Sequence, residues 1–233
     1  MPITDLDPVV TDLDLVDLIQ LSYQPDSKWD FVYHGPAADD LTVCVTRLGD
    51  VNVIVFPGTT DIPGWIRDFQ AVDATPTDHP ELGPVHFGFW QGMDGVWAAL
   101  DSKGCLAGTT IVAGHSLGAA RAVLLSGLLA AARKAPIDIV TCGEPRAGMQ
   151  TLADLLAPVR IRSYLNDPTN GFPDDPVWGV PFHVPLLFSY VHPRAPITLP
   201  CTPLAQDPWG LLAAHHIQLY AESVGSQDPM PTT

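Results

Sequence analysis

Apolar positions recur along the chain with two different periods, and these periods predict its secondary structure. Continuous or alternating apolar runs, typical of strands, occupy residues 41–47, 51–56, 109–113, 137–142 and 159–165. Helical apolar spacing occupies residues 13–21, 88–100, 119–134, 149–156 and 217–224. Strands that alternate with helices through the middle of the chain predict a mostly parallel sheet covered by helices, which is an α/β fold. We expect one domain over residues 1–233.

Charge limits the classes of partner. The 26 acidic and 11 basic residues give a formal net charge of −15. Nucleic-acid binding needs clustered Lys and Arg to neutralise phosphates, so a nucleic-acid partner is excluded. The same charge opposes electrostatic docking on an anionic membrane, but it leaves room for transient apolar contact with a lipid interface.

The cysteines and the start of the chain bear on metal binding and on location. Cys44, Cys105, Cys142 and Cys201 form no CxxC pair and have no metal-ligand spacing, so we expect free thiols and no metal. The first ten residues lack a basic region followed by a long apolar one, so no signal peptide is visible. Residues 122–132 are apolar but too few to span a bilayer. We expect a soluble protein without an integral membrane segment, either cytoplasmic or released by another route.

One short motif carries a specific chemistry. Gly114-His115-Ser116-Leu117-Gly118 fits the pattern G-x-S-x-G and lies between a predicted strand and a predicted helix. In that context the serine sits on a strained turn that exposes its hydroxyl, and the start of the helix stabilises a developing oxyanion. Ser116 is therefore predicted to be a catalytic nucleophile.

A serine nucleophile needs a base and an acid, and in this architecture they follow it in the order Ser, Asp or Glu, His. The histidines after Ser116 are His183, His192, His215 and His216. The first two lie in a loop rich in proline and aromatic residues, which favours a packing role. The other two directly precede the last predicted helix, where the catalytic base is expected.

The GHSLG motif and three further stretches together resemble motifs of the class 3 lipase family, the fungal-lipase-like branch of the α/β-hydrolases. The four stretches, in chain order, are VIVFPGTTDIPGWIRDF at 53–69, VHFGF at 85–89, GHSLG at 114–118 and TCGEPRAG at 141–148. Together with the acid and base patterns given below, the matching motifs run from about residue 53 to residue 220 and cover most of the chain. The resemblance implies an α/β-hydrolase fold with a mostly parallel central sheet.

The resemblance also implies an oxyanion hole. Thr59 would donate its backbone N–H, and Leu117, directly after the nucleophile, would donate a second one. The family usually has Arg where this chain has Pro57.

Two positions remain open for the acid and two for the base. The family pattern N-D-x-V-P-x-x-P favours Asp175, which begins D-P-V-W-G-V-P, over Asp167, which directly follows a predicted strand. The pattern H-x-hydrophobic-x-x-Y favours His215, whereas a shorter variant of the pattern would select His216.

The expected activity is therefore hydrolysis of carboxylic esters, with lipid acyl esters as the substrate class and no cofactor. Segment 61–83 is expected to act as a lid, in which Ile62 and Trp65 would cover an apolar acyl site. Phospholipase A1 activity, aromatic-acid esterase activity and a catalytically silent binding module are the alternatives. A metallohydrolase built on His215 and His216 is disfavoured, because adjacent histidines rarely converge on one ion.

Overall fold

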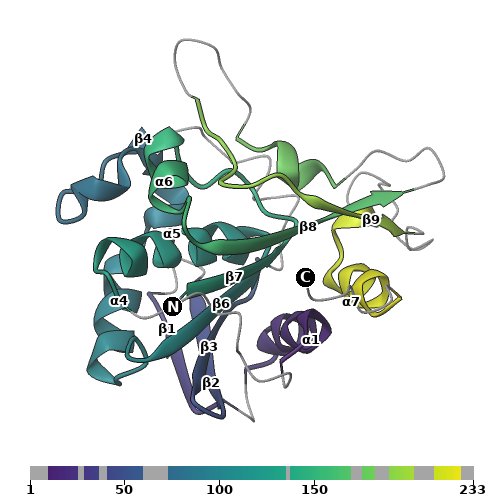
Figure 1. Cartoon of the computed structure of the whole chain (residues 1–233), viewed down its shortest axis with the longest axis horizontal. Helices are drawn as coiled ribbons and strands as arrows, with labels where there is room; N and C mark the ends of the chain where they lie inside the picture. The colour runs from purple at the N-terminus through teal and green to yellow at the C-terminus, as the bar shows by residue number, and fades with distance from the viewer. Residues whose placement is uncertain are drawn as a thin grey trace.

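The computed structural model describes residues 10–25, 29–36, 41–59, 73–134, 137–168, 175–181, 189–201 and 213–226 (Figure 1). Within these ranges the helices are α1 (Asp12–Ser22), α3 (Phe87–Trp90), α4 (Met93–Ser102), α5 (Leu117–Ala131), α6 (Gln150–Leu155) and α7 (Ile217–Gly225), with short 3-10 helices η2 (Pro80–Leu82), η3 (Pro176–Gly179) and η4 (Ala213–His215). The strands are β1 (Phe31–His34), β2 (Thr42–Leu48), β3 (Val51–Phe56), β4 (Asp73–Ala74), β5 (Val85–His86), β6 (Thr109–His115), β7 (Ile137–Cys142), β8 (Arg160–Pro168) and β9 (Ile197–Cys201).

Among the described residues, the central sheet has the strand order β1-β2-β3-β6-β7-β8-β9. The first two pairings, β1 with β2 and β2 with β3, are antiparallel, and every later pairing is parallel. β4 and β5 form a separate antiparallel pair. The parallel strands β3, β6, β7 and β8 therefore all end at the same edge of the sheet, where sites of open α/β sheets form.

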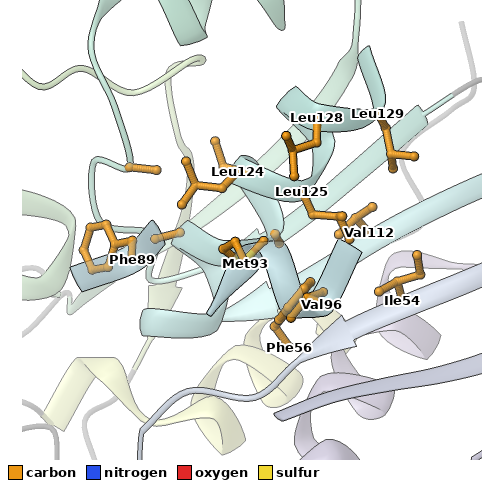
Figure 2. Close-up of a cluster of buried hydrophobic side chains, with 14 of the residues drawn as sticks. Ile54, Phe56, Phe89, Met93, Val96, Val112, Leu124, Leu125, Leu128 and Leu129 are labelled. Atoms are coloured by element: carbon orange, nitrogen blue, oxygen red, sulfur yellow. The ribbon is translucent and has the colours of Figure 1, made fainter. Parts of the chain in front are cut away.

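Each face of the sheet is covered by its own helices, because successive side chains of a strand point to opposite faces. Helices α3, α4, α5 and α6 pack on one face, and Figure 2 shows Leu124, Leu125, Val96 and Met93 in the apolar cluster that also contains Val112 of β6. Helices α1 and α7 pack against each other and on the opposite face, as Figure 1 shows. The two apolar clusters fix the sheet between two helical layers.

The sequence predicted most of this architecture correctly. The α/β fold and the antiparallel pair β2–β3 are confirmed. The helix expected over residues 88–100 is instead two helices, because Gly92 takes a left-handed conformation with φ 83° between α3 and α4. The short edge strands β1 and β9 were not predicted, and β9 includes Pro200, which weakens its strand signal.

The cysteines are free thiols, as expected. Burial raises the pKa of the Cys44 thiol to about 12, so it is inert as a nucleophile.

None of the helices within the described ranges has both the length and the apolar character that crossing a bilayer requires.

Candidate active site

The candidate site is assembled at the edge of the sheet where the parallel strands end. Pro57, Gly58 and Thr59 follow β3, Ser116 follows β6, and Gly143 follows β7. Asp175 lies beyond the end of β8, and His215 ends the turn η4 just before α7. Residues far apart in the sequence thus meet because their strands are neighbours.

Ser116 occupies the tight turn that its motif predicted. Its backbone has φ 57° and ψ −128°, a conformation that non-glycine residues rarely adopt and that costs on the order of 1–3 kcal/mol. A Cβ added to Gly118 would lie 2.3 Å from the carbonyl oxygens of Phe56 and Pro57. Only glycine at position 118 therefore lets α5 begin this close to the end of β3.

The Ser116 side chain is fully buried, and its Oγ has no hydrogen-bond partner among the described residues. Burying a hydroxyl without a partner is unfavourable, so such an atom in a folded protein needs an explanation. It also lies beside the first turn of α5, whose N–H groups and dipole favour negative charge.

Asp175 and His215 form a fully buried pair. The Nδ1 of His215 lies 2.6 Å from Oδ2 of Asp175, which assigns the proton to Nδ1 as donor. The opposite nitrogen, Nε2, has no hydrogen-bond partner in the part of the chain that the structure describes. The imidazole is therefore held at one nitrogen and is left with an unused nitrogen on the other side.

Three donors fix the Asp175 carboxylate. Besides His215, the hydroxyl of Tyr220 donates to Oδ2 over 2.7 Å, and the N–H of Val177 donates to Oδ1 over 2.9 Å. Burial by itself raises the pKa of the Asp175 carboxyl, but the electrostatic effect of His215 and these hydrogen bonds lower it below its ordinary value. Asp175 thus stays ionised, as a group that stabilises an imidazolium must.

Gly143 makes room for this pair. It has φ 57°, and an added Cβ would lie 2.6 Å from Oδ2 of Asp175 and 2.7 Å from Nδ1 of His215. Any side chain at position 143 would displace the two groups from each other.

The alternates for the acid and the base lie elsewhere. Asp167 belongs to β8, where it is paired with Pro200 of β9. His216 is the N-cap of α7, and its side chain makes no capping hydrogen bond. The structure therefore brings together His215 and Asp175, not His216 and Asp167.

Asn166 holds the acid and base segments, a role that sequence reasoning missed. Its side-chain N–H donates to the carbonyl oxygen of Ala214 over 2.9 Å. Its backbone carbonyl oxygen accepts from the backbone N–H of Asp175 over 3.3 Å. Its backbone N–H donates to the Tyr220 hydroxyl over 3.3 Å. The available signals were the Asn-Asp dipeptide at the end of a strand and the tyrosine in the H-x-hydrophobic-x-x-Y pattern.

The expected oxyanion residues flank the serine. A Cβ added to Gly58 would lie 2.8 Å from Cβ of Ser116, so the turn that carries Thr59 passes directly against the nucleophile. Thr59 is buried, and Leu117 is the first residue of α5. Both backbone N–H groups thus belong to segments that touch Ser116.

Part of the expected lid lies outside the described residues. Ile62 and Trp65 lie outside the described residues, and of segment 61–83 only residues 73–83 are described. No group of three or more His, Cys, Asp or Glu within the described ranges is placed to hold a metal ion.

The fold agrees with what the chain is similar to. The family model for lipase (class 3) matches residues 53–166, which include the Gly58–Thr59 turn and the Ser116 elbow. No curated protein matches the chain.

Several solved structures with the same fold are described as lipases. The Rhizomucor miehei triacylglyceride lipase is 22% identical with a TM-score of 0.58, and the match covers 82% of this chain and 77% of that one. Lipase II from Rhizopus niveus is 22% identical with a TM-score of 0.60, and the match covers 80% of this chain and 77% of that one. A triacylglycerol lipase described as having a serine protease triad as its catalytic centre is 23% identical with a TM-score of 0.62, over 82% and 77% of the two chains. Over residues 53–166 this chain is therefore similar to the class 3 lipases, and its fold is the one seen in these lipase structures.

Proposed function

We propose that the protein is a serine hydrolase that cleaves carboxylic esters of lipids. Ser116 is the nucleophile, His215 the general base and Asp175 the acid that orients it. The observation that carries this assignment is a pair of buried atoms, Ser116 Oγ and His215 Nε2, which both lack a hydrogen-bond partner among the described residues while the other side of the imidazole is held by Asp175. A purely structural pair would leave neither atom unused.

The reaction follows from these roles. His215 Nε2 takes the proton from Ser116 Oγ as the oxygen attacks the acyl carbonyl, and the N–H groups of Thr59 and Leu117 stabilise the resulting oxyanion. Protonated His215 gives its proton to the departing alcohol, which leaves an acyl ester on Ser116. His215 then activates a water molecule that hydrolyses this ester, and Asp175 stabilises the imidazolium in both halves.

The substrate class rests on the similar structures. The fungal neighbours are described as triacylglyceride or triacylglycerol lipases, which supports lipid acyl esters for this chain as well. Phospholipase A1 and aromatic-acid esterase activity are the alternatives within the same chemistry, and a silent binding module is the alternative outside it.

A p-nitrophenyl ester series from acetate to palmitate, measured on the wild type and on Ser116→Ala, tests the proposal. We expect turnover by the wild type and a loss of about 10⁴-fold or more in Ser116→Ala at an unchanged melting temperature. No turnover of any ester by the folded wild type would favour the silent module. Equal rates in both proteins would place the chemistry elsewhere.

We further propose that segment 61–83 acts as a lid over the acyl site. Two observations support this: Leu82, near its end, is fully buried in the core and would serve as the fixed anchor, and one similar fungal lipase–inhibitor complex is described as a model for interfacial activation. That complex is 20% identical with a TM-score of 0.54, over 84% of this chain and 78% of that one.

The lid has its own test. Trp65→Ala should slow the hydrolysis of emulsified long-chain esters much more than that of a short soluble ester, because opening exposes apolar area that lipid would cover. Equal losses on both substrates with a lowered melting temperature would instead assign Trp65 to core packing.

A further inference from the structure

A hydrogen-bonded chain runs from the oxyanion turn to the backbone of the catalytic histidine. The N–H of Gly58 donates to the Tyr23 hydroxyl over 2.9 Å, and that hydroxyl lies 2.6 Å from Nδ1 of His115. On the far side of the ring, Nε2 of His115 lies 2.7 Å from the carbonyl oxygen of His215. The side chains of Tyr23 and His115 thus join three segments that the reaction needs: the turn at Gly58, the turn that carries His115 and the nucleophile, and the segment of His215.

The direction of each bond is fixed by its ends. A carbonyl oxygen only accepts, so His115 Nε2 carries the proton and donates it to His215. The neutral ring then accepts at Nδ1, so Tyr23 donates there and its oxygen is left to accept from Gly58. This arrangement works only with a neutral imidazole.

The surroundings keep His115 neutral. Burial, with the neighbouring His215 as a second cause, lowers the pKa of His115 to about 3. His115 faces Tyr23, Tyr220 and the His215 ring, whose centroid lies 4.6 Å away in a stacked arrangement. The charge of ionised Asp175 opposes this lowering of the His115 pKa, but burial and His215 outweigh it.

We propose that Tyr23 and His115 are positioning residues that hold the oxyanion turn and the catalytic base in register with Ser116. The Gly58 N–H bond fixes the peptide that precedes Thr59, and the His115 bond fixes the backbone that carries the His215 ring. Tyr23 directly follows α1, outside the residues 53–166 that the family model matches. The N-terminal helix therefore contributes to the chemistry as well as to the core.

This inference rests on the proposed roles of Ser116, His215 and Thr59. Its test distinguishes a failure of the positioning role from a failure of those three roles. Tyr23→Phe removes one oxygen atom, which leaves the Gly58 N–H and His115 Nδ1 without their partner. Losing an oxyanion donor outright costs about 10²–10³-fold, so misplacing one should lower kcat about tenfold, with KM for a short soluble ester unchanged within about twofold.

A second readout reports on the oxyanion hole itself. Sulfur accepts hydrogen bonds poorly, so the ratio of ester to thionoester hydrolysis measures how well the donors are aimed at oxygen. We expect Tyr23→Phe to lower this ratio. His115→Gln, which keeps a donor and an acceptor, should retain more activity than His115→Phe, which keeps only the ring.

Tyr164→Phe is the matched control. The Tyr164 hydroxyl donates to Asp12 at the start of α1, so it also fastens that helix to the sheet but touches nothing in the site. Its kcat and ester ratio should stay at the wild-type values.

The outcomes are distinct. A wild-type kcat and ester ratio in Tyr23→Phe, or an equal loss in Tyr164→Phe, would overturn the positioning role. Retained activity in Ser116→Ala would instead overturn the proposed site on which that role depends.

Discussion

Two carboxylate–imidazole pairs lie near the carboxyl end of the sheet, one fully buried and one partly buried, and they differ in whether the second nitrogen of the imidazole has a hydrogen-bond partner. In the pair Asp175–His215 the two groups are 2.6 Å apart, and the second ring nitrogen has no partner among the described residues. In the pair Glu144–His192 the distance is 3.4 Å, and the second nitrogen lies 2.9 Å from the carbonyl oxygen of Trp178.

The carboxylates differ as well. The Asp175 carboxylate accepts a hydrogen bond from each of the three donors described above. Oε2 of Glu144 also accepts from two hydroxyls, those of Thr141 and Ser163, over 2.6 and 2.7 Å. Among the described residues, the partner of its other oxygen, Oε1, is His192. Because the Trp178 carbonyl oxygen only accepts, His192 Nε2 donates to it, and a neutral His192 can then accept at Nδ1 from a donor placed at the position of Oε1.

The comparison teaches how to tell a catalytic pair from a structural one. Both nitrogens of the His192 ring have hydrogen-bond partners, and the ring stacks on the Trp178 ring with centroids 3.5 Å apart. It holds the short helix η3 that follows Asp175, whereas His215 is held so that one nitrogen stays available. The following predictions test that distinction, beginning with the largest effect.

Removing the imidazoles should separate the pairs most clearly. His215→Ala should lower kcat/KM by about 10⁴-fold, because the nucleophile loses its base. His192→Ala should stay within about tenfold of the wild type while lowering the melting temperature, because Glu144 and Trp178 lose a buried partner. His216→Ala should stay within about threefold. Rates on a soluble ester, with a melting curve for each variant, provide the measurement; a base at His216 would reverse the first and last results.

Amide replacements should separate the acids. Asp175→Asn places an N–H against neighbours that all donate, so kcat should fall by about 10³–10⁴-fold. Glu144→Gln can keep every hydrogen bond, since its amide can donate to His192, so activity should stay within about threefold. Asp167→Asn should be equally mild. A severe loss in Asp167→Asn with a mild one in Asp175→Asn would contradict the assignment of the acid.

A third imidazole, with no carboxylate against it, should show its effect in stability. His115 is neutral when folded, with its pKa lowered to about 3, and takes up a proton near pH 6.5 when unfolded. The unfolded state thus binds more protons, so the contribution of His115 to stability is lost as the pH falls below about 6.5. The free-energy advantage of the wild type over His115→Gln should shrink by about 2 kcal/mol between pH 7 and pH 5. Urea unfolding at both pH values measures it, and a constant difference would mean that the pKa of His115 is not lowered by folding.

The sequence predicted the fold well because apolar periodicity decides which elements form. It failed where the signal is short: β1 spans only Phe31–His34, and a single left-handed Gly92 divides a continuous helical pattern. Neither feature changes the apolar period enough to be read from a window of residues.

The candidate site was predictable to the extent that its residues are local in the sequence. Ser116 was found from five consecutive residues, whereas the choices between Asp175 and Asp167 and between His215 and His216 stayed open because spacing cannot say which side chains meet. Tyr23 was missed altogether. Its hydroxyl contacts residues 35 and 92 positions away, and no local pattern encodes such contacts.

Labelling with a fluorophosphonate, followed by mass spectrometry of the peptides, tests the central claim most directly. The reagent reacts only with a serine that a base activates. The prediction is a single phosphonylated residue, Ser116, with labelling slowed about 10³-fold or more in His215→Ala and unchanged in His192→Ala. Ser126, also fully buried but with its hydroxyl donated to Ala122 over 2.8 Å, should remain unmodified. Labelling at a serine other than Ser116, or at equal rates in the two histidine variants, would contradict the account.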